Sequence, residues 1–142
     1  QNAESPPHIL VADDSSVARK QVERSMEQIG IKTTIVRDGK EALDQLISWA
    51  DSGIDVSKHI SLLVSDIEMP EMDGYTLTTE IRKDPRIAGI KILLHSSMSG
   101  TFNNNMVEKV GADKFIPKFS PDDLANTVQQ LVAEWKAEQM SD

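Results

Sequence analysis

The chain has 142 residues, which is enough for one ordinary domain with a single hydrophobic core. Its 23 acidic residues outnumber its 15 lysines and arginines, and the resulting net charge of -8 argues against a protein that binds the phosphate backbone of nucleic acids. The absence of cysteine excludes disulfides, thiolate metal sites and cysteine nucleophiles, and no apolar run reaches membrane-spanning length.

The first half of the chain alternates short apolar runs with longer amphipathic segments, which is typical of a parallel sheet with crossover helices. Residues 1–7 are polar, contain prolines and lack a signal-peptide pattern, so they are predicted to be a linker outside the fold. The first strand is predicted at 8–13 (HILVAD), and Ser15 or Ser16 is expected to cap the next helix. A second strand is predicted at 33–37 and is followed by a second helix.

The second half of the chain continues this alternation. The polar stretch 51–59 is predicted to be a loop, and a third strand at 61–65 (SLLVS) delivers Asp66 at its end. The following MPEMDG run is rich in turn signals. Further strands are predicted at 90–95 and 113–117, each followed by a helix. Five strand–helix units therefore predict an α/β fold around one parallel sheet.

Polar side chains lie at the ends of four predicted strands, and ligands of open α/β sheets bind at this edge. Asp13 and Asp14 end the first strand, and Asp66 follows the third. Like charges about 4 Å apart repel by roughly 4 kcal/mol at an effective dielectric constant near 20, so a cation is expected among these carboxylates. Mg²⁺ prefers such oxygen ligands. Lys118 and Ser96, at two further strand ends, would then contact a phosphoryl group carried by Asp66.

Each of these residues also has an ordinary structural explanation. An acid pair before a helix complements the helix dipole, and Asp66 could simply begin a turn. Lys118 could be a surface charge, and Ser96 a strand-end hydroxyl without a role. His95 adjoins the predicted site but is expected to be a core histidine rather than a ligand. The joint occurrence of these polar groups at consecutive strand ends favours a functional site over separate structural roles.

Three runs of the sequence resemble the receiver domains of two-component response regulators: ILVADDSSVARK, LLVSDIEMPEMDG and GADKFIPKFSPDDLA. The resemblance covers nearly all of residues 8–137. It implies a three-layer (βα)5 flavodoxin-like fold, a doubly wound parallel sheet with strand order 2-1-3-4-5, in which the receiver domain spans 8–139 and a tail covers 140–142. The implied roles are Asp66 as phosphoacceptor, Asp13, Asp14, Asp66 and the Glu68 backbone carbonyl as Mg²⁺ ligands, Lys118 and Ser96 at the phosphoryl group, and Ser96 with Phe115 as the switch pair.

The sequence departs from the common receiver pattern in three places. Phe119 follows the lysine where receivers usually have proline, so a cis peptide between residues 118 and 119 is not assumed. Phe115 lacks the hydroxyl of the tyrosine found in single-domain chemotaxis receivers. The segment 49–60 is several residues longer than is common, and its purpose is not evident from the sequence.

A narrower resemblance is to the receiver half of CheV-type chemotaxis adaptors, and it is carried by LLHSSMSG together with NNNMVEKVGADKFIPKFSPDDLA. It implies a CheW-like coupling domain ahead of the receiver, a chemotaxis-type histidine kinase as phosphodonor, and output to a chemoreceptor assembly in the cytoplasm, without nucleic acid or membrane insertion. Such a domain phosphorylates and dephosphorylates only itself and is not an enzyme. Two alternatives remain: a Mg²⁺-dependent phosphohydrolase, with Glu68 as its second acid, and a phosphorylation-independent scaffold.

Overall fold

The chain forms one parallel five-stranded sheet with the order β2-β1-β3-β4-β5, and this order confirms the predicted fold class. The computed structural model describes residues 7–96, 100–117 and 121–140, without the side chains of 100–104 and 121. The strands are β1 (His8–Ala12), β2 (Lys32–Val36), β3 (Leu62–Asp66), β4 (Ile92–Ser96) and β5 (Lys114–Pro117). The helices are α1 (Ser16–Gln28), α2 (Gly39–Asp51), α3 (Val56–His59), α4 (Gly74–Lys83), α5 (Gly100–Val110) and α6 (Pro121–Met140).

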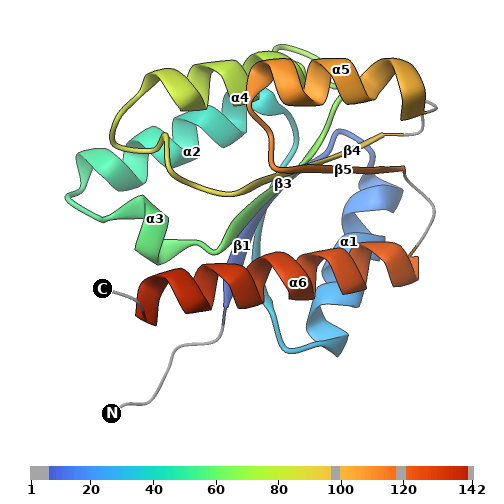
Figure 1. Cartoon of the computed structure of the whole chain (residues 1–142), viewed down its shortest axis with the longest axis horizontal. Helices are drawn as coiled ribbons and strands as arrows, with labels where there is room; N and C mark the ends of the chain where they lie inside the picture. Colours follow the sequence, from blue (N-terminus) through green and yellow to red (C-terminus); the bar gives the residue numbers. More distant parts are fainter. Residues whose placement is uncertain (1–6, 97–99, 118–120, 141–142) are drawn as a thin grey trace.

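Helices cover both faces of the sheet, as Figure 1 shows, with α1 and α6 on one side and α2, α4 and α5 on the other. Successive side chains of a strand point to opposite faces, so each strand contributes to two separate apolar clusters. In β1, Ile9 and Val11 pack toward α1 and α6, whereas Leu10 and Ala12 pack toward α2 and α4. The same alternation assigns every polar residue at a strand end to one of the two faces.

Side-chain caps set the start of three helices. The Ser15 hydroxyl accepts a hydrogen bond from the Ala18 amide at 3.2 Å, which confirms one of the two predicted caps of α1. Asp38 caps α2 and Asp73 caps α4 in the same way. These caps fix the loops between strand and helix at the carboxyl edge of the sheet, where the predicted site lies.

The stretch predicted as a loop at 51–59 contains the short helix α3, so the prediction was wrong for its second half. Val56 is fully buried and belongs to the core cluster beneath α2 and α4. The indole N–H of Trp135 donates a hydrogen bond to the backbone oxygen of Ser57 at 2.7 Å, and the ring of Trp49 packs edge-on against His59. A four-residue helix is too short to show a hydrophobic period in the sequence, and these tertiary contacts hold it in place.

The described helices include none that is both long and apolar enough to cross a membrane.

Candidate functional site

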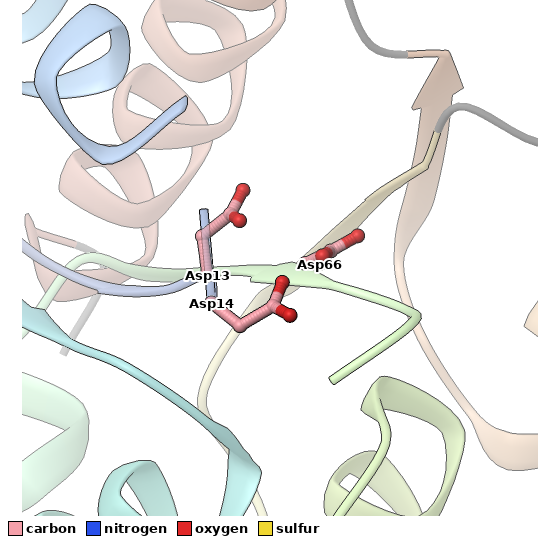
Figure 2. Close-up of side chains that lie close together, drawn as sticks. All are labelled: Asp13, Asp14 and Asp66. Carbon is pink, nitrogen blue, oxygen red and sulfur yellow. The ribbon is translucent and has the colours of Figure 1, made fainter. Parts of the chain in front are cut away.

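Three carboxylates gather at the carboxyl end of the two neighbouring strands β1 and β3 (Figure 2). Asp13 and Asp14 follow β1, and Asp66 is the last residue of β3. One carboxylate oxygen from each residue lies within 4.8 Å of the others. Asp13 and Asp66 are buried, with 0% and 3% of their surface exposed, while Asp14 is exposed to solvent. The structure therefore brings together the three acids that the sequence singled out.

The backbone and side chain of Asp13 are held by three neighbouring residues. Its Oδ1 accepts the Ser15 amide at 2.9 Å, and its backbone oxygen accepts the guanidinium of Arg19 at 2.7 Å. Its own amide donates to the backbone oxygen of Val36 on β2 at 3.2 Å. Asp13 is consequently fixed in position before any ligand binds.

Asp66 is positioned by the close approach of the first residue of α4. A Cβ atom added at Gly74 would overlap the backbone oxygen of Asp66 and would lie 3.0 Å from the Cα of Ile67. The Gly74 amide also donates to the backbone oxygen of Ile67 at 2.8 Å, and the Ser65 hydroxyl donates to the Asp66 backbone oxygen at 2.8 Å. Glycine is therefore required at position 74 because the backbone of Asp66 occupies the space of a side chain.

The loop between β3 and α4 contains Glu68, whose side chain is exposed. Glu71 in the same loop adopts φ of 67°, in the left-handed region that non-glycine residues seldom occupy. The loop is tied to the start of α2 because the Gly39 amide donates to the backbone oxygen of Met72 at 3.2 Å. These contacts give the segment around Asp66 a defined path.

The donor set of this cluster fits a hard divalent cation. Three carboxylate groups from Asp13, Asp14 and Asp66 offer only oxygen atoms, which Mg²⁺ prefers, and the exposed Asp14 leaves an approach from solvent. Without a cation the three negative charges repel one another at close range. The acids would thus hold Mg²⁺ in the position that the sequence predicts.

The predicted switch residues lie on the two strands beyond β3. Ser96 is fully buried at the end of β4, and Phe115 on β5 is half-buried against the core cluster beneath α4 and α5. Leu94 pairs with Phe115 in the sheet, and Ser96 pairs with Pro117, so the two predicted switch side chains share one face. Lys118 and the peptide after it lie outside the described residues, and the described residues contain no cis peptide bond.

His95 is the residue whose position sequence reasoning missed. It is 4% exposed, in keeping with the predicted core histidine, but its Nε2 lies 3.4 Å from Oδ2 of Asp13. His95 pairs with Asp66 in the sheet, and Ala12 pairs with Ser65, which puts Asp13 at the same level. This juxtaposition could have been found from the sequence only once the strand order and register were assumed.

Comparison with known proteins gives a consistent result. The family model for the response regulator receiver domain matches residues 9–129. The chemotaxis proteins CheV3 and CheV1 of Helicobacter pylori are 30% and 34% identical over 125 and 124 residues, which cover 87% of this chain but 40% and 37% of those proteins. The chain thus spans about two fifths of the length of these relatives. The receiver domain of Francisella response regulator 1452 is 30% identical, with a TM-score of 0.75, and the match covers 90% of this chain and 98% of that one.

Proposed function

The chain belongs to the response regulator receiver domain family, and we propose that it acts as a switch in which Asp66 accepts a phosphoryl group from a histidine kinase. The observation that carries this proposal is the cluster of Asp13, Asp14 and Asp66, whose carboxylate oxygens lie within 4.8 Å of one another at the carboxyl end of β1 and β3. Such a cluster offers oxygen ligands for a cation beside a carboxylate that can accept a phosphoryl group, which supports the proposal.

In the proposed transfer, a carboxylate oxygen of Asp66 forms a bond to phosphorus while the bond from phosphorus to the kinase histidine nitrogen breaks. The imidazole leaves with the electron pair. Asp13 and Asp14 would hold Mg²⁺, with the Glu68 backbone carbonyl as a further ligand, and when bound the ion neutralises charge on the phosphoryl oxygens. Lys118 is proposed to contact the same oxygens. The chain itself would supply position, since the close approach of Gly74 supports the Asp66 backbone from which the carboxylate attacks.

The proposed output is a change of the face formed by β4, β5 and α5. Phosphorylation adds about 1.5 to 2 negative charges beside two other acids, so neighbouring donors have to rearrange. The Ser96 hydroxyl would move toward the phosphoryl group, and Phe115 would turn into the space that Ser96 leaves. A shift in population from 1:99 to 99:1 needs about 5.5 kcal/mol, which exceeds one charge-assisted set of hydrogen bonds, so we expect a partial shift.

We further propose a role in chemotaxis, since the relatives CheV3 and CheV1 are chemotaxis proteins. In this proposal the chain is the receiver part of an adaptor, a chemotaxis-type kinase is its phosphodonor, and its phosphorylation state changes how the adaptor contacts a chemoreceptor assembly. The domain would turn over only its own phosphoryl group, and so it would not be an enzyme with a separate substrate.

Intact mass after incubation with acetyl phosphate tests the proposal. We expect one phosphoryl adduct on the wild-type chain with Mg²⁺, none with a chelator, and none on Asp66→Asn. Asp44→Asn, a change of an exposed acid on α2, is the matched control and should form the adduct normally. Absence of an adduct on the wild type at reaction times from seconds to hours would contradict the proposal, and multiple turnovers of a generic phosphate ester would favour a phosphohydrolase instead.

A further inference from the structure

A buried histidine reaches the acid cluster across the strand that carries Asp66. Strand β3 lies between β1 and β4, so Asp13 and His95 flank Asp66 on its two sides. All three lie on the face covered by α1 and α6, as do Leu93, Val11 and Val64 earlier on the same strands. The 3.4 Å contact between His95 Nε2 and Asp13 Oδ2 therefore spans the phosphoacceptor strand.

The contact adds His95 to the described neighbours of Asp13. Oδ1 accepts the Ser15 amide, the backbone oxygen accepts Arg19, and Oδ2 faces the imidazole. A carboxylate oxygen is an acceptor only, so the contact is favourable when Nε2 of His95 carries a proton. Asp14, which is exposed, has a different environment from this enclosed neighbour.

We propose that His95 is a positioning residue that sets the orientation of the Asp13 carboxylate for cation binding. The inference rests on the proposed function of the acid cluster as a Mg²⁺ site. A group that orients a metal ligand raises affinity because the ligand does not have to be ordered when the ion binds, and removal of such a group typically weakens binding 10- to 100-fold. Asp13 is thus the rigid acid of the site and Asp14 the adjustable one.

Two substitutions of His95 distinguish a role in orienting the Asp13 carboxylate from a role in packing alone. His95→Leu removes the N–H group but keeps an apolar side chain, and His95→Gln keeps an amide N–H near the position of Nε2. The matched control is Leu93→Ala, because Leu93 lies two residues earlier on β4, belongs to the apolar cluster on the same face of the sheet and has no hydrogen-bonding side chain. It lowers stability by creating a cavity, without changing the neighbours of Asp13.

The measurement is the Mg²⁺ dissociation constant of the full chain by isothermal titration calorimetry, without a phosphodonor. We expect His95→Leu to weaken Mg²⁺ binding at least tenfold, His95→Gln to stay within threefold of the wild type, and Leu93→Ala to stay within twofold. In ¹⁵N-imidazole spectra of the wild type, the Nε2 resonance of His95 should show an attached proton both before and after Mg²⁺ is added.

Three results would overturn the inference: His95→Leu binding Mg²⁺ within twofold of the wild type, His95→Gln being as weak as His95→Leu, or Nε2 losing its proton when the ion binds. The last result would make His95 a ligand, and Zn²⁺ affinity would then fall more than Mg²⁺ affinity in both variants. A chain that gives the expected Mg²⁺ affinities but forms no phosphoryl adduct supports the role of His95 while contradicting the proposed function.

Discussion

The two ends of the sheet are built on opposite principles. At the carboxyl end, Asp13, Asp14 and Asp66 hold three like charges within 4.8 Å of one another, two of them buried. At the amino end, aromatic rings pack together, and those of Trp49 and His59 meet edge-on with centroids 4.7 Å apart. The first arrangement opposes folding and the second favours it. The comparison indicates that contacts distant from the acids provide the stability that lets the acids remain close.

The amino end also has the most extensively bonded side chain among the described hydrogen bonds. Arg82, at the end of α4, donates to the backbone oxygens of Ala88, Ile90 and Gly111 at 2.6 to 2.9 Å. It also donates to the carboxylate of Asp113 at 3.1 Å. One cation thereby joins the loop before β4 to the loop before β5.

The largest effect is expected at Gly74, at the carboxyl end of the sheet. A large loss of stability from one added methyl group there would break the comparison, because it would show that a contact at the carboxyl end can decide the stability of the chain. Gly74→Ala forces a Cβ against the backbone oxygen of Asp66, so we expect a loss of about 3 kcal/mol in the free energy of unfolding and reduced phosphoryl uptake by Asp66. Urea denaturation and intact mass measure the two effects. Gly89→Ala is the matched control, because a Cβ there meets nothing within 4 Å. Equal stability of the two variants would contradict the close approach.

A smaller loss in the free energy of unfolding is expected when Arg82 is replaced. This result would support the view that contacts at the amino end stabilise the chain. Arg82→Leu removes the donor of three backbone oxygens and leaves the Asp113 carboxylate with the Ile92 amide, which should cost about 2 kcal/mol while Mg²⁺ affinity stays within twofold. Arg86→Leu is the control, because Arg86 contacts only exposed or partly exposed carboxylates and should cost less than about 1 kcal/mol. The idea that the amino end supplies stability fails if Arg82→Leu unfolds at the same urea concentration as Arg86→Leu.

Removing one charge from the cluster should stabilise the chain by about 1 kcal/mol in the absence of a cation, since the Asp14 carboxylate is exposed and largely screened by water. Asp14→Asn should also lose the stabilisation that Mg²⁺ gives the wild type, because an ion that binds only the folded state raises the free energy of unfolding. Thermal melts with and without Mg²⁺ show both effects. Glu23→Gln, which neutralises an exposed acid on α1, should retain the response to Mg²⁺. A fall in stability of Asp14→Asn without Mg²⁺ would show that the acids do not repel one another.

Much of the fold could be predicted because each strand is an apolar run bounded by turn residues. The carboxyl end of each predicted strand falls within one residue of the observed one, for example residue 65 against Asp66 for β3 and residue 95 against Ser96 for β4. Helix α3 could not be predicted, because its single buried residue, Val56, stands in a polar stretch and is ordered by contacts from distant parts of the chain. Local pattern carries no information about such contacts.

The candidate site was predictable to the extent that it follows from parallel strands. The carboxyl ends of such strands meet at one edge, which brings Asp13 and Asp66 together whatever the detailed register. The contact of His95 with Asp13 depends on β3 lying between their strands, which the family resemblance implied, and on the register of both strand pairs, which a single sequence does not show. The proposed role of Lys118 stays a prediction, since it lies outside the described residues.

The smallest expected effect tests whether the packed rings at the amino end still favour folding when His8 takes up a proton. His8 starts β1, its Nε2 lies 2.6 Å from the hydroxyl of Thr34, and its ring meets those of Trp49 and His59. Burial lowers the pKa of His8 below its ordinary value of 6.5, and the nearby charges of His59 on α3 and Lys32 on β2 lower it further.

Because its pKa is lowered in the folded state, His8 contributes stability above pH 6.5 that is lost as the pH falls through the folded pKa, where the unfolded chain already binds the proton. We expect the free energy of unfolding, measured in urea at pH 7.5 and 5.5, to fall less in His8→Gln than in the wild type. The two proteins should differ in this fall by less than the value for one proton bound by the unfolded chain alone, since the His8 ring is only partly buried. His59→Gln removes one of the two charges, so the pKa of His8 measured by NMR should move back toward 6.5 in that variant. An identical pH dependence in His8→Gln and the wild type would mean that acid destabilises the chain through groups other than His8. The amino end would then keep its stabilising role even with His8 protonated.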